Sequence, residues 1–138
     1  MAGTIKLEVV TPEKVVVSDD AQIVVCPGAL GEFGALVGHT PFLTTLKTGT
    51  MRYSDESGGE RFIFVSGGFA ETLPNKVTVL AESAERRRDI DETRAKAAKE
   101  RAEERLAQKG SADIDFERAK AALERALHRI RLAGSRRI

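Results

Sequence analysis

The composition of this chain changes abruptly near residue 83, and this change constrains the fold more than any single motif does. Ten of the twelve glycines, all four prolines and six of the seven aromatic residues lie before this point. The remainder is rich in Ala, Glu, Arg and Lys, which favour helices, whereas Gly and Pro mark turns. We therefore expect an α+β protein with a β domain over residues 1–84 and a helical domain over residues 85–138.

The first part consists of short apolar runs separated by turn residues. Ile5, Leu7 and Val9 alternate with polar residues, which is the period of a half-buried strand. Many short strands with no helix between them favour a sandwich or a barrel over a parallel sheet. Ser57-Gly58-Gly59 is expected to form a hairpin turn. Further strands are predicted at residues 15–17, 22–26, 44–48, 50–53, 61–65, 69–73 and, as the last strand, 77–81.

The second part predicts two helices joined by a short turn. The first helix is expected over about residues 91–108, and the second is expected to end near Ala133. A short connection makes two helices antiparallel neighbours. The predicted start and stop signals are Asp89 or Asp91 before the first helix, Gly110 after it and Asp113 before the second.

The face that the first helix could bury is made mostly of alanines. Burial of a leucine side chain contributes about 1.5–3 kcal/mol, and an alanine methyl contributes well under half of that. The first helix should therefore dock weakly, which suits a segment that moves; the alternative is a loosely attached solubilising hairpin. The predicted stripes are Ala95, Ala98, Ala102 and Leu106 on the first helix, and Phe116, Ala119, Leu123, Leu127 and Ile130 on the second.

Charge is distributed unevenly along the chain. Residues 1–83 hold 6 basic and 10 acidic side chains, a net charge of −4, and residues 84–138 hold 16 and 11, a net charge of +5. Such a basic segment favours an acidic surface, a phosphate or an anionic membrane as its partner. On the second helix a stripe of arginines lies almost opposite the predicted apolar face, so a bound anion would lie on an outer face. This stripe consists of Arg118, Arg125, Arg129 and Arg136.

Several classes of protein are disfavoured. The sequence has no run of eighteen apolar residues that would predict a membrane span, and no secretion signal is expected. Cys26 is the single cysteine, so we expect no internal disulfide and interpret it as a small buried side chain. Ser66 lacks a G-x-S-x-G context, and there is no phosphate-binding G-x-x-x-x-G-K-[ST] motif. We expect no catalytic residues and no metal site.

Four stretches of the sequence resemble the ε subunit of F-type ATP synthase. They are LEVVTPEKVVVSDDAQIVV, GALGEFGALVGHTPFLTTLKTGTMRY, FVSGGFAETLPNKVTVLAESAE and DIDETRA. They occur in the family's order over essentially the whole chain, and SGGFAE with NKVTVLA is the most specific part. Val37 stands before Gly38 and His39 where the family usually has proline.

The resemblance implies an N-terminal antiparallel β-sandwich followed by a C-terminal antiparallel two-helix hairpin. The sandwich would bind the γ subunit of the central stalk and rest on the membrane c-ring. The hairpin would lie down on the sandwich, or extend along γ to an acidic segment of the β subunit and block ATP hydrolysis. Such a non-catalytic subunit would be peripheral to the cytoplasmic face of a bacterial plasma membrane. The implied interface residues are Glu32, Gly38, His39, Arg118, Arg136 and Arg137.

The resemblance also implies a nucleotide site at the start of the hairpin. IDETRA, residues 90–95, is similar to the Ile/Leu-Asp-x-x-Arg-Ala pattern of nucleotide-binding members. By this match Asp91 would accept a hydrogen bond from the adenine amino group, and Arg94 would lie beside the base or ribose. ATP would be a regulatory ligand, with no cofactor required; alternatively, Asp91 and Arg94 form an ordinary helix cap. The other matched positions are the acidic Glu85 and, for the phosphates, Arg101, Arg125 and Arg129.

Two other functions remain open at this point. One is a stand-alone ATP-sensing module, which ATP would stabilise through Arg94. The other is a small nucleic-acid-binding β-barrel with a basic arm. The net charge of −4 on residues 1–83 and the lack of aromatics interleaved with Lys and Arg disfavour nucleic acid.

Overall fold

The computed structural model of the chain describes residues 3–108 and 115–135. The chain divides into two compact units, Met1–Arg87 and Arg88–Ile138. The predicted boundary lay after residue 84. The difference arises because residues 83–86 form a strand that pairs with the sheet of the first unit.

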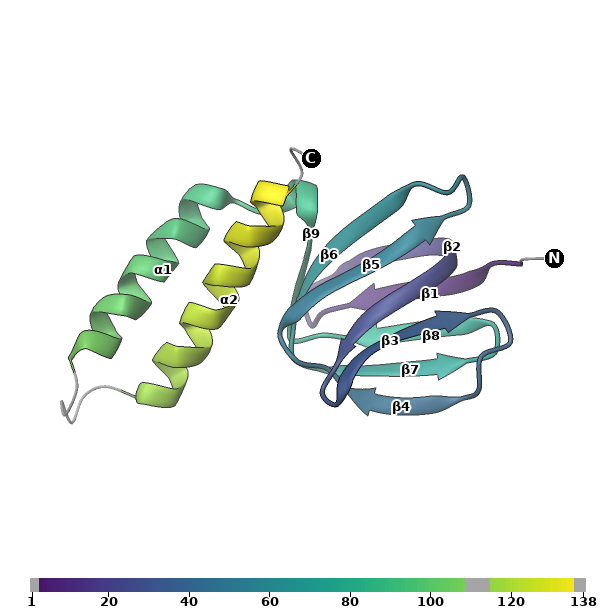
Figure 1. Ribbon diagram of the computed structural model, residues 1–138, viewed down its shortest axis with the longest axis horizontal. Helices are drawn as coiled ribbons and strands as arrows, with labels where there is room; N and C mark the ends of the chain where they lie inside the picture. The colour runs from purple at the N-terminus through teal and green to yellow at the C-terminus, as the bar shows by residue number, and fades with distance from the viewer. Residues whose placement is uncertain (1–2, 109–114, 136–138) are drawn as a thin grey trace. The chain divides into compact units, whose positions relative to one another are not determined.

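Within residues 3–87, strands form a single nine-stranded sheet. Neighbouring strands follow the order β4-β7-β8-β1-β2-β5-β6-β9, and β3 pairs with β2 (Figure 1). The pairing of β1 with β8 is parallel, and the other pairings of named strands are antiparallel. The strands are β1 (Ile5–Val10), β2 (Val15–Gly28), β3 (Gly31–Leu36), β4 (Phe42–Thr45), β5 (Gly49–Asp55), β6 (Glu60–Ser66), β7 (Phe69–Leu73), β8 (Lys76–Leu80) and β9 (Ser83–Arg86).

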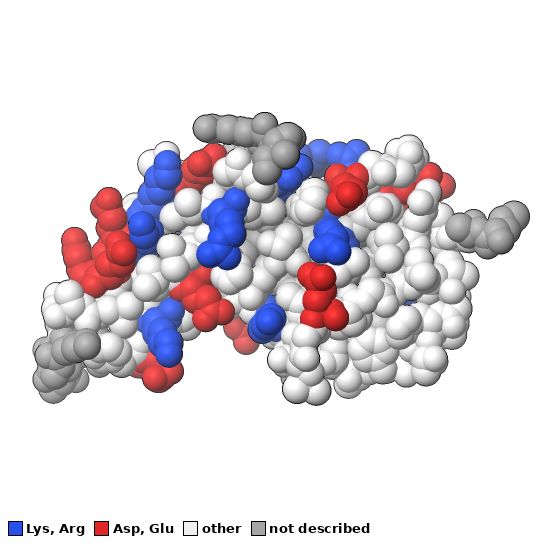
Figure 2. Space-filling model, in the orientation of Figure 1, with Lys and Arg blue, Asp and Glu red and all other residues white. Residues whose placement is uncertain are grey.

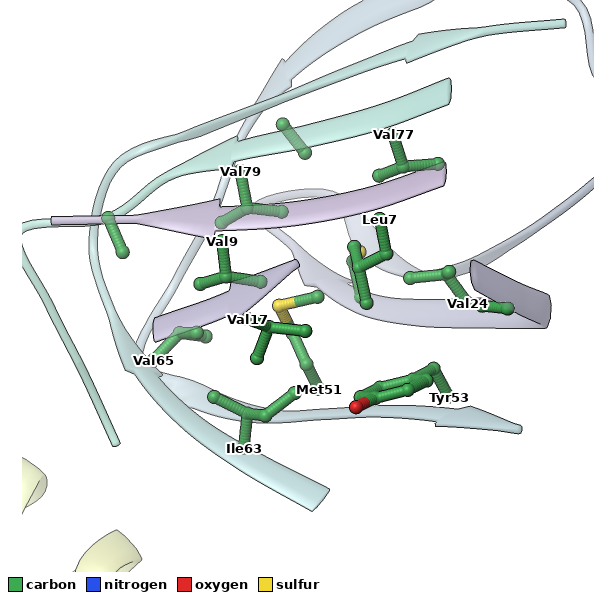
Figure 3. Close-up of a cluster of buried hydrophobic side chains, with 14 of the residues drawn as sticks. Leu7, Val9, Val17, Val24, Met51, Tyr53, Ile63, Val65, Val77 and Val79 are labelled. Carbon is green, nitrogen blue, oxygen red and sulfur yellow. The ribbon is translucent and has the colours of Figure 1, made fainter. Parts of the chain in front are cut away.

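The sheet closes over one apolar core, which makes this unit the predicted β-sandwich. Alternate residues of β1, namely Ile5, Leu7 and Val9, are buried, as the period-two pattern predicted. Side chains from both layers point toward one another in this core (Figure 3). Those labelled there are Leu7, Val9, Val17, Val24, Met51, Tyr53, Ile63, Val65, Val77 and Val79.

Four strand assignments were wrong. The strand predicted at residues 44–48 lies instead at Phe42–Thr45, as β4. Residues 15–17 and 22–26 belong to one continuous strand, β2, because Ser18, Asp19 and Asp20 between them pair with β1. Strand β3 was not predicted, because its two glycines interrupt the alternation of apolar and polar residues. In the structure it pairs with β2 alone. Residues 77–81 are not the last strand, because β9 follows and pairs with β6. The predicted turn at residues 57–59 is confirmed between β5 and β6.

The second unit is a pair of helices, α1 (Glu92–Ala107) and α2 (Phe116–Ser135), which lie side by side (Figure 1). A short 3₁₀ turn, η1 (Arg87–Asp89), precedes α1. Asp91 is the N-cap of α1. It is one of the two caps, Asp89 or Asp91, that the sequence predicted. Asp115 accepts a hydrogen bond from the backbone N–H of Arg118 at 3.1 Å and so caps α2. The predicted signals Gly110 and Asp113 lie outside the described residues.

Candidate partner and nucleotide surfaces

Alanines form the buried line of each helix of the hairpin. Ala95 and Ala102 are buried on α1, and Ala119, Ala126 and Ala133 are buried on α2. A spacing of seven residues is about two helical turns, so each set forms a straight line. Because alanine is small, the two helix axes can approach closely along these lines. The alanine face predicted for the first helix is confirmed at Ala95 and Ala102.

The apolar face predicted for the second helix was only partly correct. Phe116 and Leu127 remain 38% and 37% exposed, and Leu123 and Ile130 are half-buried. At about 100° per residue, the centre of the predicted face is turned roughly 60° from the line of alanines. The alanine line is buried instead, because an alanine contact allows a closer helix pair than leucine does.

Arginines of both helices gather on one face of the hairpin. Rotation by about 100° per residue places Arg94 and Arg101 roughly 100–120° from the alanine line of α1. The same construction places Arg125 and Arg129 roughly 80–120° from the alanine line of α2, in the same rotational sense. In an antiparallel pair, equal rotations from the contact line lead to the same face. Four residues that were predicted to contact the phosphates or the base, Arg94, Arg101, Arg125 and Arg129, therefore lie on the same face of the hairpin. This face is next to the line along which the two helices touch.

This arginine face, defined by Arg94, Arg101, Arg105, Arg118, Arg125 and Arg129, carries little negative charge. Within residues 92–107 and 116–135, the glutamates stand at other rotations, and the nearest acids are the caps Asp91 and Asp115. Arg94, Arg101 and Arg118 are exposed, whereas Arg125 and Arg129 are half-buried. Figure 2 shows a face of the hairpin on which basic and acidic side chains are mixed. Arg136 and Arg137 lie outside the described residues.

Asp91 and Arg94 interact through the backbone of the helix. The carboxylate Oδ1 of Asp91 accepts a hydrogen bond from the backbone N–H of Arg94 at 3.0 Å. This bond satisfies one of the free N–H groups at the start of α1. Asp91 therefore caps the helix, while the guanidinium of Arg94 extends from an exposed position. Glu85, the remaining predicted nucleotide residue, lies half-buried on β9 in the first unit, opposite Phe64 in the ladder.

The predicted interface loop of the sandwich is held in a defined shape. Gly38 has a φ of +83°, which explains its glycine, and its N–H donates to the carbonyl of Pro74 at 2.7 Å. The N–H of His39 donates to the carbonyl of Leu36 at 3.0 Å, which closes the turn. The His39 ring lies 5.2 Å from the ring of Phe42, measured between centroids. Val37, in place of the family's proline, leaves this turn intact.

Glu32 lies at an exposed position on β3. Its carboxylate pairs with the guanidinium of Arg52 on β5 at 3.5 Å. Leu30, at the tip of the hairpin that joins β2 and β3, is fully exposed.

An apolar groove on the sandwich was not predicted from the sequence. Strand pairing places Phe69, Leu80 and Val10 in one row across β7, β8 and β1, and Phe69 and Leu80 are 51% and 54% exposed. The groove has a volume of about 670 Å³. The exposed ends of two apolar strands were the signal that could have revealed it. Its lining residues are Val10, Thr11, Pro12, Thr45, Leu46, Gly67, Gly68, Phe69, Leu80, Ala81 and Glu82.

Two glycines of the SGGFAE stretch shape this groove. Gly67 and Gly68 have φ angles of +67° and +104°, which residues with a side chain rarely adopt. They turn the chain from β6 into β7 and bring it against residues 80–82. The N–H of Leu46 donates to the carbonyl of Gly68 at 2.9 Å and closes one wall.

Three further features of the described residues concern metal binding and nucleophilic side chains. No group of three or more His, Cys, Asp or Glu side chains there could hold a metal ion. Cys26 is buried, as predicted, and desolvation raises the pKa of its thiol to about 12, so it stays protonated and unreactive. Ser66 is buried, with its hydroxyl 3.4 Å from that of Thr48. No described helix is long and apolar enough to cross a bilayer.

Both units match models of known families. Residues 4–87 match the β-sandwich domain of the ATP synthase δ/ε chain, and residues 88–134 match its long α-helix domain. The chain is 66% identical over 112 residues to the ATP synthase ε chain of Desulfatibacillum aliphaticivorans, which covers 81% of this chain and 79% of the relative. It is 65% identical over 106 residues to that of Desulfosudis oleivorans, covering 77% and 80%.

Solved structures show the same fold at low sequence identity. A chain in the mitochondrial ATP synthase of Euglena gracilis, in a structure of OSCP, F1 and the c-ring, aligns with a TM-score of 0.74 at 23% identity. The alignment covers 88% of this chain and 76% of that chain. A chain in the central stalk and c-ring structure of Tetrahymena thermophila aligns with a TM-score of 0.56 at 12% identity, covering 99% and 98%. The sandwich and the helix pair match the two domain families in order, and the relatives are 65–66% identical. The chain therefore belongs to the ε subunits of F-type ATP synthase, the non-catalytic stalk subunits of that complex.

Proposed function

We propose that this subunit joins the γ subunit to the c-ring in the central stalk and regulates ATP hydrolysis through its helical hairpin. The match of residues 4–87 and 88–134 to the two domains of the family carries the proposal. In this role the chain is peripheral to the cytoplasmic face of the bacterial plasma membrane and performs no catalysis itself.

The sandwich offers two surfaces to different partners. The groove around Phe69 and Leu80 is apolar and open, which suits an apolar segment of γ. The exposed tip at Leu30 and Glu32, together with the ordered loop at His39, suits the polar loops of the c-ring. Contact with the ring through these loops would transmit rotation because both are held in defined shapes.

The hairpin offers a cationic surface to an acidic partner. Arg118 is exposed on the arginine face, and the family resemblance pairs this part of the hairpin with an acidic segment of the β subunit. Planar guanidinium groups bind carboxylates in pairs of hydrogen bonds. We propose that this contact, to which Arg136 and Arg137 add positive charge, blocks hydrolysis when the hairpin is extended.

ATP is proposed as a competing ligand of the same hairpin. The gathering of Arg94, Arg101, Arg125 and Arg129 on one face supports a triphosphate there, with Asp91 of the same unit on the base side. A ligand that binds one arrangement of the hairpin shifts the population toward it by its difference in affinity. ATP bound to the arginine face would neutralise the charge that the β subunit needs.

The main experiment is a truncation after Arg87, which removes the hairpin and keeps β9 in the sheet. The truncated chain should still assemble with γ and the c-ring, and the reconstituted complex should lose its ATPase latency. Leu80→Asp in the full chain is the complementary variant, since a charge in the groove should weaken assembly with γ. Leu43→Asp, at another exposed position of the sandwich, is the matched control. Unchanged latency after truncation would overturn the regulatory role, and unchanged assembly of Leu80→Asp would exclude the groove.

A further inference from the structure

We infer that Arg86 is an anchor that holds strand β9 on the sandwich, so that any movement of the hairpin begins after Arg87. The inference extends the proposed function, because it defines where the mobile part of the regulator starts. It depends on contacts made entirely within the first unit.

Three groups from two other strands hold the guanidinium of Arg86. Its Nε donates to the backbone carbonyl of Val16 on β2 at 3.2 Å, and its Nη1 donates to the Tyr53 hydroxyl on β5 at 3.2 Å. Its Nη2 lies 3.5 Å from a carboxylate oxygen of Asp19 on β2. The Tyr53 hydroxyl also donates to Asp19, so the carboxylate, the phenol and the guanidinium form a closed network.

This network is shielded from solvent over most of its surface. Tyr53 belongs to the core, and the Arg86 side chain is only 20% exposed. Hydrogen bonds to charged groups are stronger than neutral ones, and partial burial reduces their competition with water. Arginine suits the site because its planar fork can reach a carbonyl, a hydroxyl and a carboxylate at once.

Strand β9 needs such an anchor because its own pairing is small. It has four residues, it is at the end of the strand order, and it pairs with β6 alone. Short edge strands have little stability of their own. The side chain of Arg86 ties β9 to β2 and β5, which are not its neighbours in the ladder. Arg87 adds a second contact, with its guanidinium 4.4 Å from the ring centroid of Phe62.

The anchor leaves a short tether between the two units. Arg87 is held on Phe62, and Asp91 is held as the cap of α1. Three residues, 88–90, connect these two attachments, and Ile90 among them is buried. Four Cα to Cα steps span at most about 14 Å. The length of this connection limits how far the first turn of α1 can lie from Arg87.

Hydrogen exchange of the isolated full chain tests the anchor. In the wild type, amides of residues 83–87 should exchange as slowly as those of β6 and more slowly than those of residues 88–91. Arg86→Met keeps much of the aliphatic stem and removes the guanidinium, so exchange in residues 83–87 should accelerate about tenfold. Arg88→Met, two residues on at an exposed position, removes the same charge and should leave this exchange unchanged.

Tyr53→Phe provides a milder variant that removes one hydroxyl from the network. It should accelerate exchange of residues 83–87 about threefold while β1 exchanges as in the wild type. The inference is overturned if the amides of β9 exchange as fast as those of α1 in the wild type. It is also overturned if Arg86→Met and Arg88→Met change the exchange of residues 83–87 to the same extent. These measurements do not depend on ATPase latency, so loss of the regulatory role and loss of the anchor give separate results.

Discussion

A Cβ atom placed on Gly68 would lie 2.0 Å from the backbone carbonyl oxygen of Leu80. Real Cβ atoms do not approach an oxygen so closely, and the oxygen belongs to the backbone, so the strand itself would have to move. The pair therefore fixes how the turn after β6 packs against the end of β8. Together with the positive φ of Gly68, this contact explains why the SGGF stretch tolerates no side chain there.

The first prediction concerns this contact. Gly68→Ala should destabilise the sandwich by about 2–4 kcal/mol, because the backbone clash adds to the cost of a positive φ. Gly58→Ala is the control, since Gly58 also has a positive φ but faces open space, and should cost only about 1–2 kcal/mol. Urea unfolding of the two variants measures the difference. Equal losses would show that the predicted clash has no effect.

The second prediction concerns the close contact of the helices. Ala126→Leu should lower the stability of the hairpin by about 1–3 kcal/mol, because a larger side chain on the buried alanine line separates the helices. Ala121→Leu, on an exposed position of the same helix, adds the same atoms and should have little effect. Thermal melting followed by the helical circular dichroism signal compares them. A loss for Ala121→Leu as large as that for Ala126→Leu would contradict the proposed contact line.

The third prediction concerns the arginine face. If ATP binds there, Arg125→Ala should weaken ATP binding to the isolated full chain about tenfold or more, since a charge-assisted phosphate contact is lost. Arg131→Ala removes the same side chain from the other side of α2 and should bind ATP like the wild type. Isothermal titration calorimetry measures both affinities. Equal affinities for the two variants would exclude this face as the nucleotide site.

The fourth prediction concerns acid stability at the turn between β5 and β6. The Asp55 carboxylate accepts hydrogen bonds from the Ser57 hydroxyl at 2.7 Å, from the N–H of Gly59 and Ser57, and from Arg61 Nε. The Ser57 hydroxyl first, and then the Gly59 N–H, lower the pKa of Asp55 below its ordinary value of 3.8. A lowered folded pKa gives stability that is present above the unfolded value and is lost as pH falls through the folded value.

Asp55→Asn should therefore destabilise the chain at neutral pH, and its difference from the wild type should shrink as the pH drops below about 4. Glu56→Gln, at the next exposed position, is the control for the loss of one negative charge. Urea unfolding at several pH values measures the free energy of each variant. A wild-type advantage that stays constant from neutral to strongly acidic pH would show that these hydrogen bonds do not favour the charged form.

The strand β2 illustrates what local sequence cannot predict. The polar residues Ser18, Asp19 and Asp20 interrupt the apolar pattern, and two separate strands were predicted on either side of them. They continue the strand because β1 supplies their backbone partners and because Tyr53 and Arg86 satisfy Asp19. Those residues lie 34 and 67 positions further along the chain (53 − 19 and 86 − 19), so no local pattern contains them.

The hairpin also shows which features of the candidate site follow from local sequence and which follow from tertiary contacts. The spacing of residues along one helix was sufficient to predict the alanine line of α1 and the row of arginines on α2, because helical rotation is the same in every helix. Which side of α2 is buried was predicted only in part, since that depends on how closely the partner helix approaches. The common face of Arg94, Arg101, Arg125 and Arg129 follows only from the antiparallel pairing around the alanines.

The sequence by itself determined the division into a β part and a helical part, the alternation in β1, an aspartate cap at Asp89 or Asp91 and the buried state of Cys26. These features depend on composition, on the period of a single element, or on neighbours a few residues apart. The tertiary structure decided the continuity of β2, the presence of β3 and β9, the groove at Phe69 and Leu80, and the network of Arg86. Each of these depends on backbone and side-chain groups that only the folded chain brings together, and their energies come from burial and pairing across strands distant in sequence.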